Sequence, residues 1–253
     1  MPDFPPDAFN DVFATREQPI ILGGQAVNLW GKIYSPRVPM LRKFEPFVST
    51  DADIFGTPAL GVSVARQCGW AVATNHEPRN PISAILTKET EGGLLRVDVL
   101  RSILGVSASE IEDAADDYEL SPGKICRLPA PPLLLKAKIA NLRQLDNERG
   151  DGSPRNDLKH VSMLILICAH YVRHMAEATR SGAARERDFI NLLHRTHEII
   201  HSESAVEVAR KYNLDFSEAL PLDLDTTGLP KLANFYTNLQ RQTDSENRRV
   251  IPI

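Results

Sequence analysis

Two carboxylates, Asp51 and Asp53, alternate with apolar residues in the stretch 49–55, which reads STDADIF. In an extended strand, residues i and i+2 project from the same face, roughly 7 Å apart. Two anionic groups side by side repel each other, so a half-buried strand retains them only with a compensating cation. The pair predicts a divalent metal site if further ligands come beside it. The alternative is a solvated strand or loop that binds nothing.

A third acid, Asp98, lies between Val97 and Val99 in the apolar run 94–100. Burying a carboxylate in such a strand without a partner is costly. One interpretation is therefore a functional role. The other is the solvated face of an edge strand, where Arg96 at i−2 serves as an ion-pair partner. The residues leave both interpretations open.

A pair of glycines, Gly23 and Gly24, follows the apolar strand expected over 20–22 and precedes the helical spacing of residues 25–30. Two glycines allow the backbone to come close to a ligand, and a helix N-terminus offers free N–H groups to an anion. A tight turn that simply needs glycine is the alternative.

The elements that must position these groups follow from hydrophobic periodicity and from proline and glycine punctuation. Thr57 is placed to cap a helix that has Pro58 at its first position. We expect strands over 20–22, 49–55, 70–74, 81–87 and 94–100, with a polar hairpin loop over 88–93. We expect helices over 7–16, 25–30, 59–67, 107–117, 133–145, 155–178, 185–201, 203–212 and 228–242, an irregular basic connection over 35–47, a charged loop over 146–154 and a loosely ordered tail over 244–253.

Three prolines, Pro129, Pro131 and Pro132, mark a junction between two halves of the chain. All expected strands precede it, and only helices are expected after it. The predicted organisation is an α/β (α+β) domain over residues 1–128, followed by a helical domain over residues 129–253.

The 253-residue chain is 42% hydrophobic and 25% charged, as in ordinary soluble globular proteins. Its net charge of −4 excludes a globally basic nucleic-acid binder. The N-terminus lacks signal-peptide regions, and no apolar run reaches the ~18 residues that span a bilayer, so we expect a cytoplasmic protein without a membrane partner. Cys68, Cys126 and Cys168 are widely spaced and odd in number, which predicts reduced, buried thiols.

The glycine pair, the Asp-x-Asp pair and the third acid together form a known pattern. Over residues 18–101, the chain resembles the nucleotidyltransferase superfamily of the polymerase-beta type. Within this superfamily, the chain is most similar to the AbiEii-type nucleotidyltransferases. This resemblance rests on the sequence STDAD at 49–53, on Lys136 and Arg143, and on a helix that begins near 155–158. These are toxins of toxin–antitoxin and abortive-infection systems. The interval from Gly24 to Asp51 departs from the family, because its 26 intervening residues exceed the usual spacing.

The resemblance implies a mixed-sheet nucleotidyltransferase fold and Mg²⁺-dependent transfer of a nucleoside monophosphate from an NTP to a hydroxyl. Two divalent ions can stabilise both oxygens of an in-line displacement, which requires several converging carboxylates. The implied metal ligands and catalytic residues are Asp51, Asp53 and Asp98, of which the last would also orient or deprotonate the acceptor. The implied nucleotide-binding residues are Gly23, Gly24, Ser49, Thr50 and Lys136.

The implied partners are an NTP, an acceptor such as the 3′ end of tRNA or another RNA, and an antitoxin protein. A protein side chain or a small molecule is equally compatible as the acceptor. The basic residues Arg37, Arg42 and Lys43 of the connection 35–47 can contact nucleotide or nucleic acid, but a solvated loop is favoured.

Two other functions stay open. An inactive nucleotidyltransferase fold can serve as a binding or scaffold module, although an inactive site has no physical reason to keep three carboxylates together. Arg155 and His160 have the spacing of HEPN-type ribonucleases, in which an Arg and a His on one helical turn assist RNA cleavage.

Histidines also recur at helical spacing, with His194, His197 and His201 at i, i+3 and i+7 and His170 with His174 at i, i+4. Such spacing suits a transition metal, but no Glu completes a His-Glu-x-x-His pattern. A polar helix face is therefore favoured.

Overall fold

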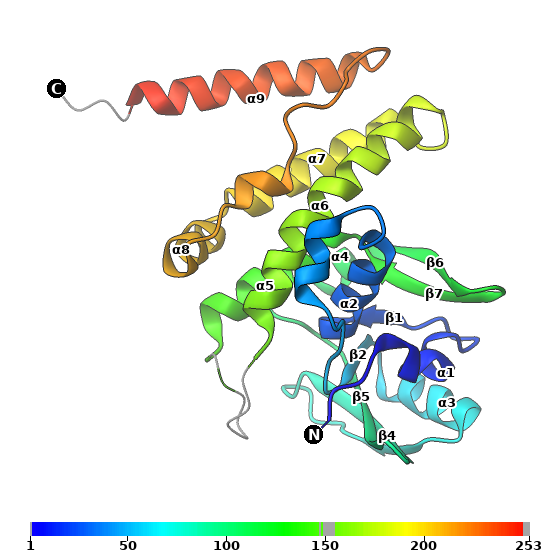
Figure 1. Ribbon diagram of the computed structural model, residues 1–253. Coiled ribbons are helices and arrows are strands. Elements are labelled where there is room, and N and C mark those ends of the chain that lie inside the picture. Colours follow the sequence, from blue (N-terminus) through cyan, green and yellow to red (C-terminus); the bar gives the residue numbers. More distant parts are fainter. Residues whose placement is uncertain (1, 147, 149–154, 250–253) are drawn as a thin grey trace.

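The computed structural model describes residues 2–146, 148 and 155–249, with the backbone alone for 240 and 242–249. One mixed β-sheet forms the first half, and helices stack on it through the second half (Figure 1). The predicted α/β organisation with a helical C-terminal part is therefore confirmed at this level.

In the described part of the chain, the sheet has seven strands in the order β3-β4-β5-β2-β1-β7-β6. Strand β2 pairs parallel with β5, and β1 pairs parallel with β7, while the remaining neighbours are antiparallel. The strands are β1 (Ile20–Leu22), β2 (Ala52–Phe55), β3 (Ala71–Thr74), β4 (Ile82–Thr90), β5 (Gly93–Leu100), β6 (Ala115–Ser121) and β7 (Lys124–Pro129).

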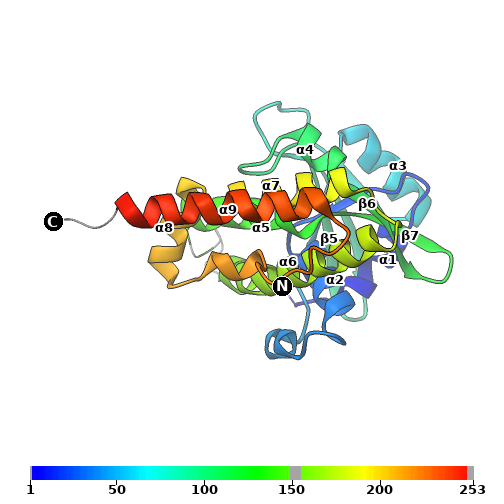
Figure 2. The ribbon, with the colours of Figure 1, turned by 90° about the horizontal axis from the view of Figure 1, so that it is seen from above.

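The helices follow most of the expected ranges. The α-helices are α1 (Asn10–Phe13), α2 (Gly23–Tyr34), α3 (Pro58–Cys68), α4 (Ala108–Asp113), α5 (Pro131–Gln144), α6 (Asp157–Arg180), α7 (Glu186–Ile200), α8 (Glu203–Tyr212) and α9 (Pro230–Arg249). Short 3-10 turns are η1 (Pro6–Phe9), η2 (Pro39–Phe44) and η3 (Phe216–Ala219). Helix α9 lies across α7 on the side away from the sheet, as Figures 1 and 2 show.

The predicted start of α3 is confirmed. The Thr57 side chain accepts a hydrogen bond from the backbone N–H of Leu60, and Pro58 occupies the first turn. The helix ends at Gly69, whose φ of +70° is a conformation that favours glycine.

The hairpin of β6 and β7 was not predicted, and it replaces the end of the expected helix 107–117. Helix α4 has a capping box between Ser107 and Glu110 and stops after six residues. The chain then turns back at Gly123, whose φ is +76°. Strand β7 buries Cys126 and Leu128 in the core, and the acidic segment of β6 pairs with this buried strand instead of continuing the helix.

Three other boundaries differ from the expected ones. Asp51 lies just before β2 rather than inside it. The connection 35–47 contains the 3-10 turn η2. Helix α9 continues through 244–249, so the prediction of a loosely ordered tail is wrong for these residues. Residues 250–253 lie outside the described residues. Residues 147 and 149–154 of the predicted charged loop also lie outside them.

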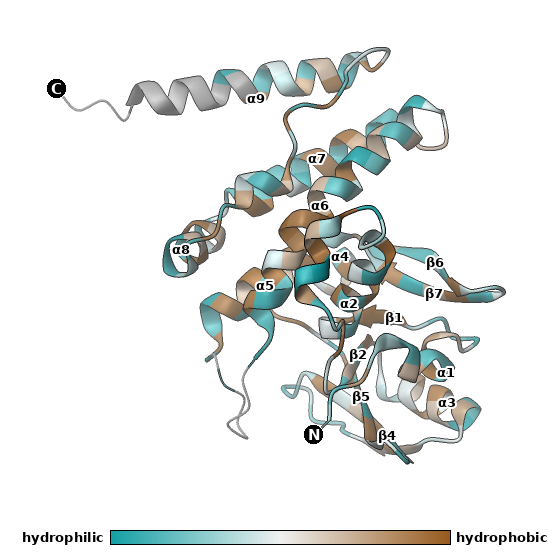
Figure 3. Cartoon of the chain, viewed as in Figure 1, coloured by the Kyte–Doolittle hydropathy of each residue, from teal (hydrophilic) through white to brown (hydrophobic). Residues whose placement is uncertain are grey.

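The two predicted halves share one hydrophobic core. Trp30 of α2 packs against Tyr118 of β6 and Tyr171 of α6, with ring centroids 4.7 and 5.5 Å apart. Its indole N–H donates to the backbone carbonyl of Pro129. Figure 3 shows apolar residues continuing from the sheet into α6. The boundary predicted at 128/129 therefore falls at the end of β7, beside a continuous core.

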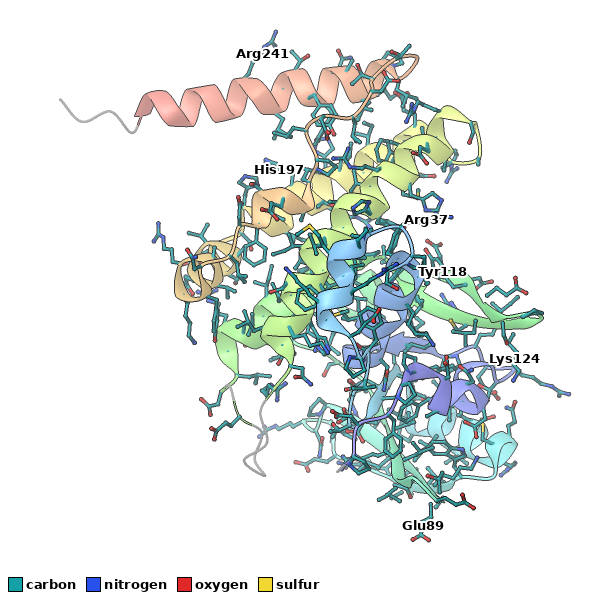
Figure 4. The ribbon with its side chains drawn as sticks, viewed as in Figure 1. Arg37, Glu89, Tyr118, Lys124, His197 and Arg241 are labelled. Atoms are coloured by element: carbon teal, nitrogen blue, oxygen red, sulfur yellow. The ribbon has the colours of Figure 1, made fainter. Side chains whose placement is uncertain are left out.

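No described helix is both long and apolar enough to cross a membrane. The three thiols are free, as predicted; Cys126 and Cys168 are buried, whereas Cys68 is only half-buried. Figure 4 shows Glu89 and Lys124 at the outer ends of the two hairpins, where both side chains are exposed.

Candidate active site

The structure places Asp53 and Asp98 directly beside each other. They are register partners on the parallel strands β2 and β5, and Asp51 immediately precedes β2. Strand β5 lies between β4 and β2, so the edge-strand interpretation of Asp98 is wrong. Its predicted ion-pair partner is nevertheless confirmed. Arg96 donates from Nε to Oδ1 of Asp98 at 2.7 Å and from Nη2 to Oδ2 at 3.1 Å.

Gly23 brings the backbone against one of these carboxylates. Strand β1 pairs with β2 so that Leu22 opposes Asp53, and Gly23 follows with a φ of +62°. A Cβ atom at Gly23 would lie 1.8 Å from Oδ2 of Asp53. Glycine is therefore required at position 23 for two reasons, the positive φ of the turn and the close approach to Asp53.

Gly24 closes the same wall from the first turn of α2. A Cβ atom there would lie 2.8 Å from Oγ of Ser49 and 3.1 Å from Cε1 of His160. The N-cap residue of α2, Leu22, supplies no side-chain hydrogen bond. The first backbone N–H groups of α2 therefore begin beside the carboxylates and receive no cap from the Leu22 side chain.

These groups line a cavity of about 890 Å³ between the sheet, α5 and α6. A volume of this size suits a small-molecule ligand. Of the residues predicted from the sequence, the cavity is lined by Gly23, Gly24, Ser49, Asp51, Asp53 and Asp98, and also by Arg155 and His160 from the alternative ribonuclease prediction. The residues of the two alternative predictions thus line one cavity.

Two predicted nucleotide-binding residues are not brought to this cavity. Thr50 is absent from its lining, and its hydroxyl group lies 3.2 Å from Oδ1 of Asp51. Lys136 lines a separate cavity of about 550 Å³ and binds Glu110 at 2.6 Å. Each residue turns an α-helix by about 100°, so residues two apart lie on nearly opposite faces, and Lys138 rather than Lys136 lines the cavity that holds the carboxylates.

Sequence reasoning missed Lys138 and its partner Asp157. Nζ of Lys138 lies 2.7 Å from Oδ1 of Asp157, and Arg155 donates to Oδ2 at 2.8 Å. Both Lys138 and Asp157 are buried. The available signal was the helical periodicity of 133–145, which separates residues 136 and 138 onto different faces.

Electrostatic coupling follows from these contacts. Hydrogen bonding to Asp98 raises the pKa of Arg96, and the charges of Asp51 and Asp53 act in the same direction. Burial works to raise the pKa of Asp157, but Lys138 and the other donors outweigh it and hold this pKa well below its usual range. The carboxylate of Asp157 therefore stays ionised at neutral pH.

The residues fit Mg²⁺ in chemical type, because carboxylate oxygens are the ligands that this ion prefers. As placed, no three His, Cys, Asp or Glu side chains of the described residues form a group that could hold a metal ion. Asp98 is engaged by the Arg96 guanidinium instead. Three carboxylates and one protein cation thus occupy this edge of the cavity.

The histidines of α7 form a polar helix face, as favoured from the sequence. The rings of His197 and His201 lie 4.1 Å apart, and His194 packs edge-on against Phe235. Figure 4 shows His197 on the outer side of the helical part, away from the sheet.

Comparison of the sequence with known proteins identifies no relative of this chain. No protein-family model matches the chain, and no curated protein matches it. The resemblance to AbiEii-type enzymes therefore stays a prediction from the residue pattern.

Proposed function

We propose that this protein is a nucleotidyltransferase that transfers a nucleoside monophosphate from an NTP to a hydroxyl group and releases pyrophosphate. The observation that carries the proposal is the pairing of Asp53 with Asp98 on adjacent parallel strands, in a cavity that Asp51 and the two glycines also line. We further propose the polymerase-beta-type fold for residues 1–128.

The carboxylates would hold two Mg²⁺ ions. When bound, two such ions stabilise the attacking and leaving oxygens of an in-line displacement. Asp98 would orient the acceptor hydroxyl and accept its proton. The acceptor oxygen bonds to the α-phosphorus, the bond to the bridging oxygen breaks, and its electron pair leaves with pyrophosphate.

The triphosphate would lie between two walls of the cavity. On the sheet side, phosphate oxygens would approach the first N–H groups of α2, which begins with Gly23 and Gly24. On the helical side, Lys138 and Arg155 supply two positive charges, and both contact Asp157. Asp146 and Glu148 also line the cavity, so these two cations would serve as individual phosphate contacts.

The AbiEii-like pattern extends the proposal to biological role. It suggests a cytoplasmic toxin of a toxin–antitoxin or abortive-infection system, an RNA 3′ end such as that of tRNA as acceptor, and an antitoxin protein as partner. Growth arrest on expression, relieved by Asp53→Asn, is the expected phenotype of such a toxin.

The activity is tested by incubating the protein with Mg²⁺, each α-labelled NTP in turn and a cell extract. We expect one NTP to label an RNA species, and Asp51→Ala to abolish the label. Absence of label with the wild type, or equal labelling by Asp51→Ala, would overturn the proposed activity. A labelled protein or small molecule would keep the activity and change only the acceptor.

A matched control is Glu89→Gln, because Glu89 is an exposed acid at the end of the β4–β5 hairpin (Figure 4) and does not line the cavity. Its labelling should equal that of the wild type. His160→Ala should separate the ribonuclease alternative, since RNA cleavage that depends on His160 without NTP would favour that function.

A further inference from the structure

Arg96 lies beside Asp51, Asp53 and Asp98 at the edge of the cavity and has no role in the transfer reaction proposed above. It lines the cavity and makes two hydrogen bonds with Asp98, one to each carboxylate oxygen. Its side chain is 31% exposed, whereas that of Asp98 is 10% exposed. Arg96 therefore approaches a buried carboxylate from the open side of the site.

The fork geometry matters because it engages the whole carboxylate. A bidentate guanidinium fixes the plane of its partner as well as neutralising its charge. The charges of Asp51 and Asp53 also attract the guanidinium. Arg96 thus balances, in part, the same negative charge that a divalent ion would balance.

We propose that Arg96 is a positioning residue that stands in for a cation at Asp98 and gives up this carboxylate when a divalent ion binds. The inference rests on the proposed function, since it assigns Asp98 to metal. The physical basis is competition, because a divalent ion that approaches Asp98 meets the positive charge already bound there.

Two consequences follow for the metal-free and metal-bound protein. Without Arg96, the carboxylates lose their counter-charge, so the metal-free protein should melt at a lower temperature. A divalent ion then meets no competing cation, so it should bind more tightly. A purely structural ion pair would lower stability without raising metal affinity.

The test uses the full-length protein and Mn²⁺, whose free concentration is followed by electron paramagnetic resonance during titration. Arg96→Met keeps much of the side-chain volume and removes the charge. We expect it to bind Mn²⁺ at least about fivefold more tightly than the wild type, the factor expected for a partly exposed ion pair. Mn²⁺ should also raise the melting temperature of Arg96→Met more than that of the wild type.

Arg101→Met is the matched control, because Arg101 is also half-buried but donates from Nη2 to the backbone carbonyl of Asn75. Its Mn²⁺ affinity should equal that of the wild type. Arg96→Lys retains a charge without the fork and should give an intermediate affinity. If Arg96→Met does not fold, a Mn²⁺ affinity of Arg96→Lys above that of the wild type still tests the proposal.

Equal or weaker Mn²⁺ binding by both Arg96 variants would overturn the inference. If the wild type still labelled an acceptor in that case, the proposed function would stand and only the exchange at Asp98 would fail. Absence of Mn²⁺ binding in every variant, together with absence of labelling, would overturn both.

Discussion

Charge balance decides what each acidic residue contributes at this site. Asp51, Asp53 and Asp98 bring three negative charges to one cavity edge, and Arg96 offsets one of them. Carboxylates that are useful as metal ligands repel one another when no metal is bound. Function and stability should therefore respond in opposite directions when Asp51 or Asp53, which lack the Arg96 fork of Asp98, is neutralised.

Asp53→Asn tests this opposition. The labelling rate should fall at least about 100-fold, since metal ions supply several kcal/mol of transition-state stabilisation. The free energy of unfolding should stay equal or rise by about 1 kcal/mol, because repulsion is relieved. Urea unfolding and the labelling assay measure the two effects. A large loss of stability with activity retained would contradict the assignment.

Asp157 should stabilise the fold, unlike Asp53, because its buried carboxylate binds two cations, Lys138 and Arg155. Asp157→Asn should lower the free energy of unfolding at pH 7 by about 3–5 kcal/mol, because it leaves Lys138 buried without its counter-charge. The measurement is urea unfolding of both proteins, followed by circular dichroism.

The pH dependence of that difference follows from linkage. The pKa of Asp157 is lower in the folded protein than the ~3.9 of an unfolded chain. The ion pair therefore contributes fully above about pH 4, and its contribution is lost as pH falls toward the folded pKa. The gap between wild type and Asp157→Asn should shrink below about pH 4. A gap that stays constant down to pH 3 would rule out this source of stability.

At the scale of elements, the site depends on how β1, β2 and β5 are joined. Parallel pairing aligns Asp53 with Asp98, and antiparallel pairing sets Leu22 opposite Asp53. The turn from β1 into α2 must then pass within contact of a carboxylate. Glycine at position 23 is thus a requirement of sheet register as well as of backbone conformation.

Gly23→Ala should abolish Mn²⁺ binding and labelling, because the new Cβ atom would displace the Asp53 side chain. Gly69→Ala is the control, since Gly69 has a similar φ of +70° but nothing within 4 Å of its Cβ position. Gly69→Ala should cost only the backbone strain of about 1–2 kcal/mol and keep activity. If the two variants had equal activity, contact with Asp53 would not be the reason for the glycine.

At the scale of the whole molecule, the sheet and the helices form one hydrophobic unit. Trp30 is almost fully buried where α2, β6 and α6 meet. The cavity lies between these same parts, with metal-type ligands on the sheet and cations on α5 and the start of α6. The relative position of the two walls therefore depends on the shared core.

The protein should unfold in one cooperative transition. Tryptophan fluorescence reports on the surroundings of Trp30 and Trp70, and far-ultraviolet circular dichroism reports on the helices; their denaturation midpoints should coincide. Trp30→Ala should lower the free energy of unfolding by about 3–5 kcal/mol in both signals. Two separate transitions, or a stable fragment 1–128, would instead show independent domains.

The residues by themselves determined most of what is local. The strand before Gly23, the cap of α3 and the helical character of α5 to α8 depend on neighbours within a few positions, so periodicity and capping predict them. The types of the three acids also indicate a cation without any knowledge of the fold.

Tertiary structure decided what depends on distant pairing. The pairing of β6 with β7 overrode helical spacing, and the central position of β5 made Asp98 a cavity residue rather than an edge residue. The packing of α5 placed Lys138 in this cavity, beside Asp157, and turned Lys136 to Glu110. Strand order and helix rotation arise from contacts between segments far apart in the chain, which local patterns do not encode.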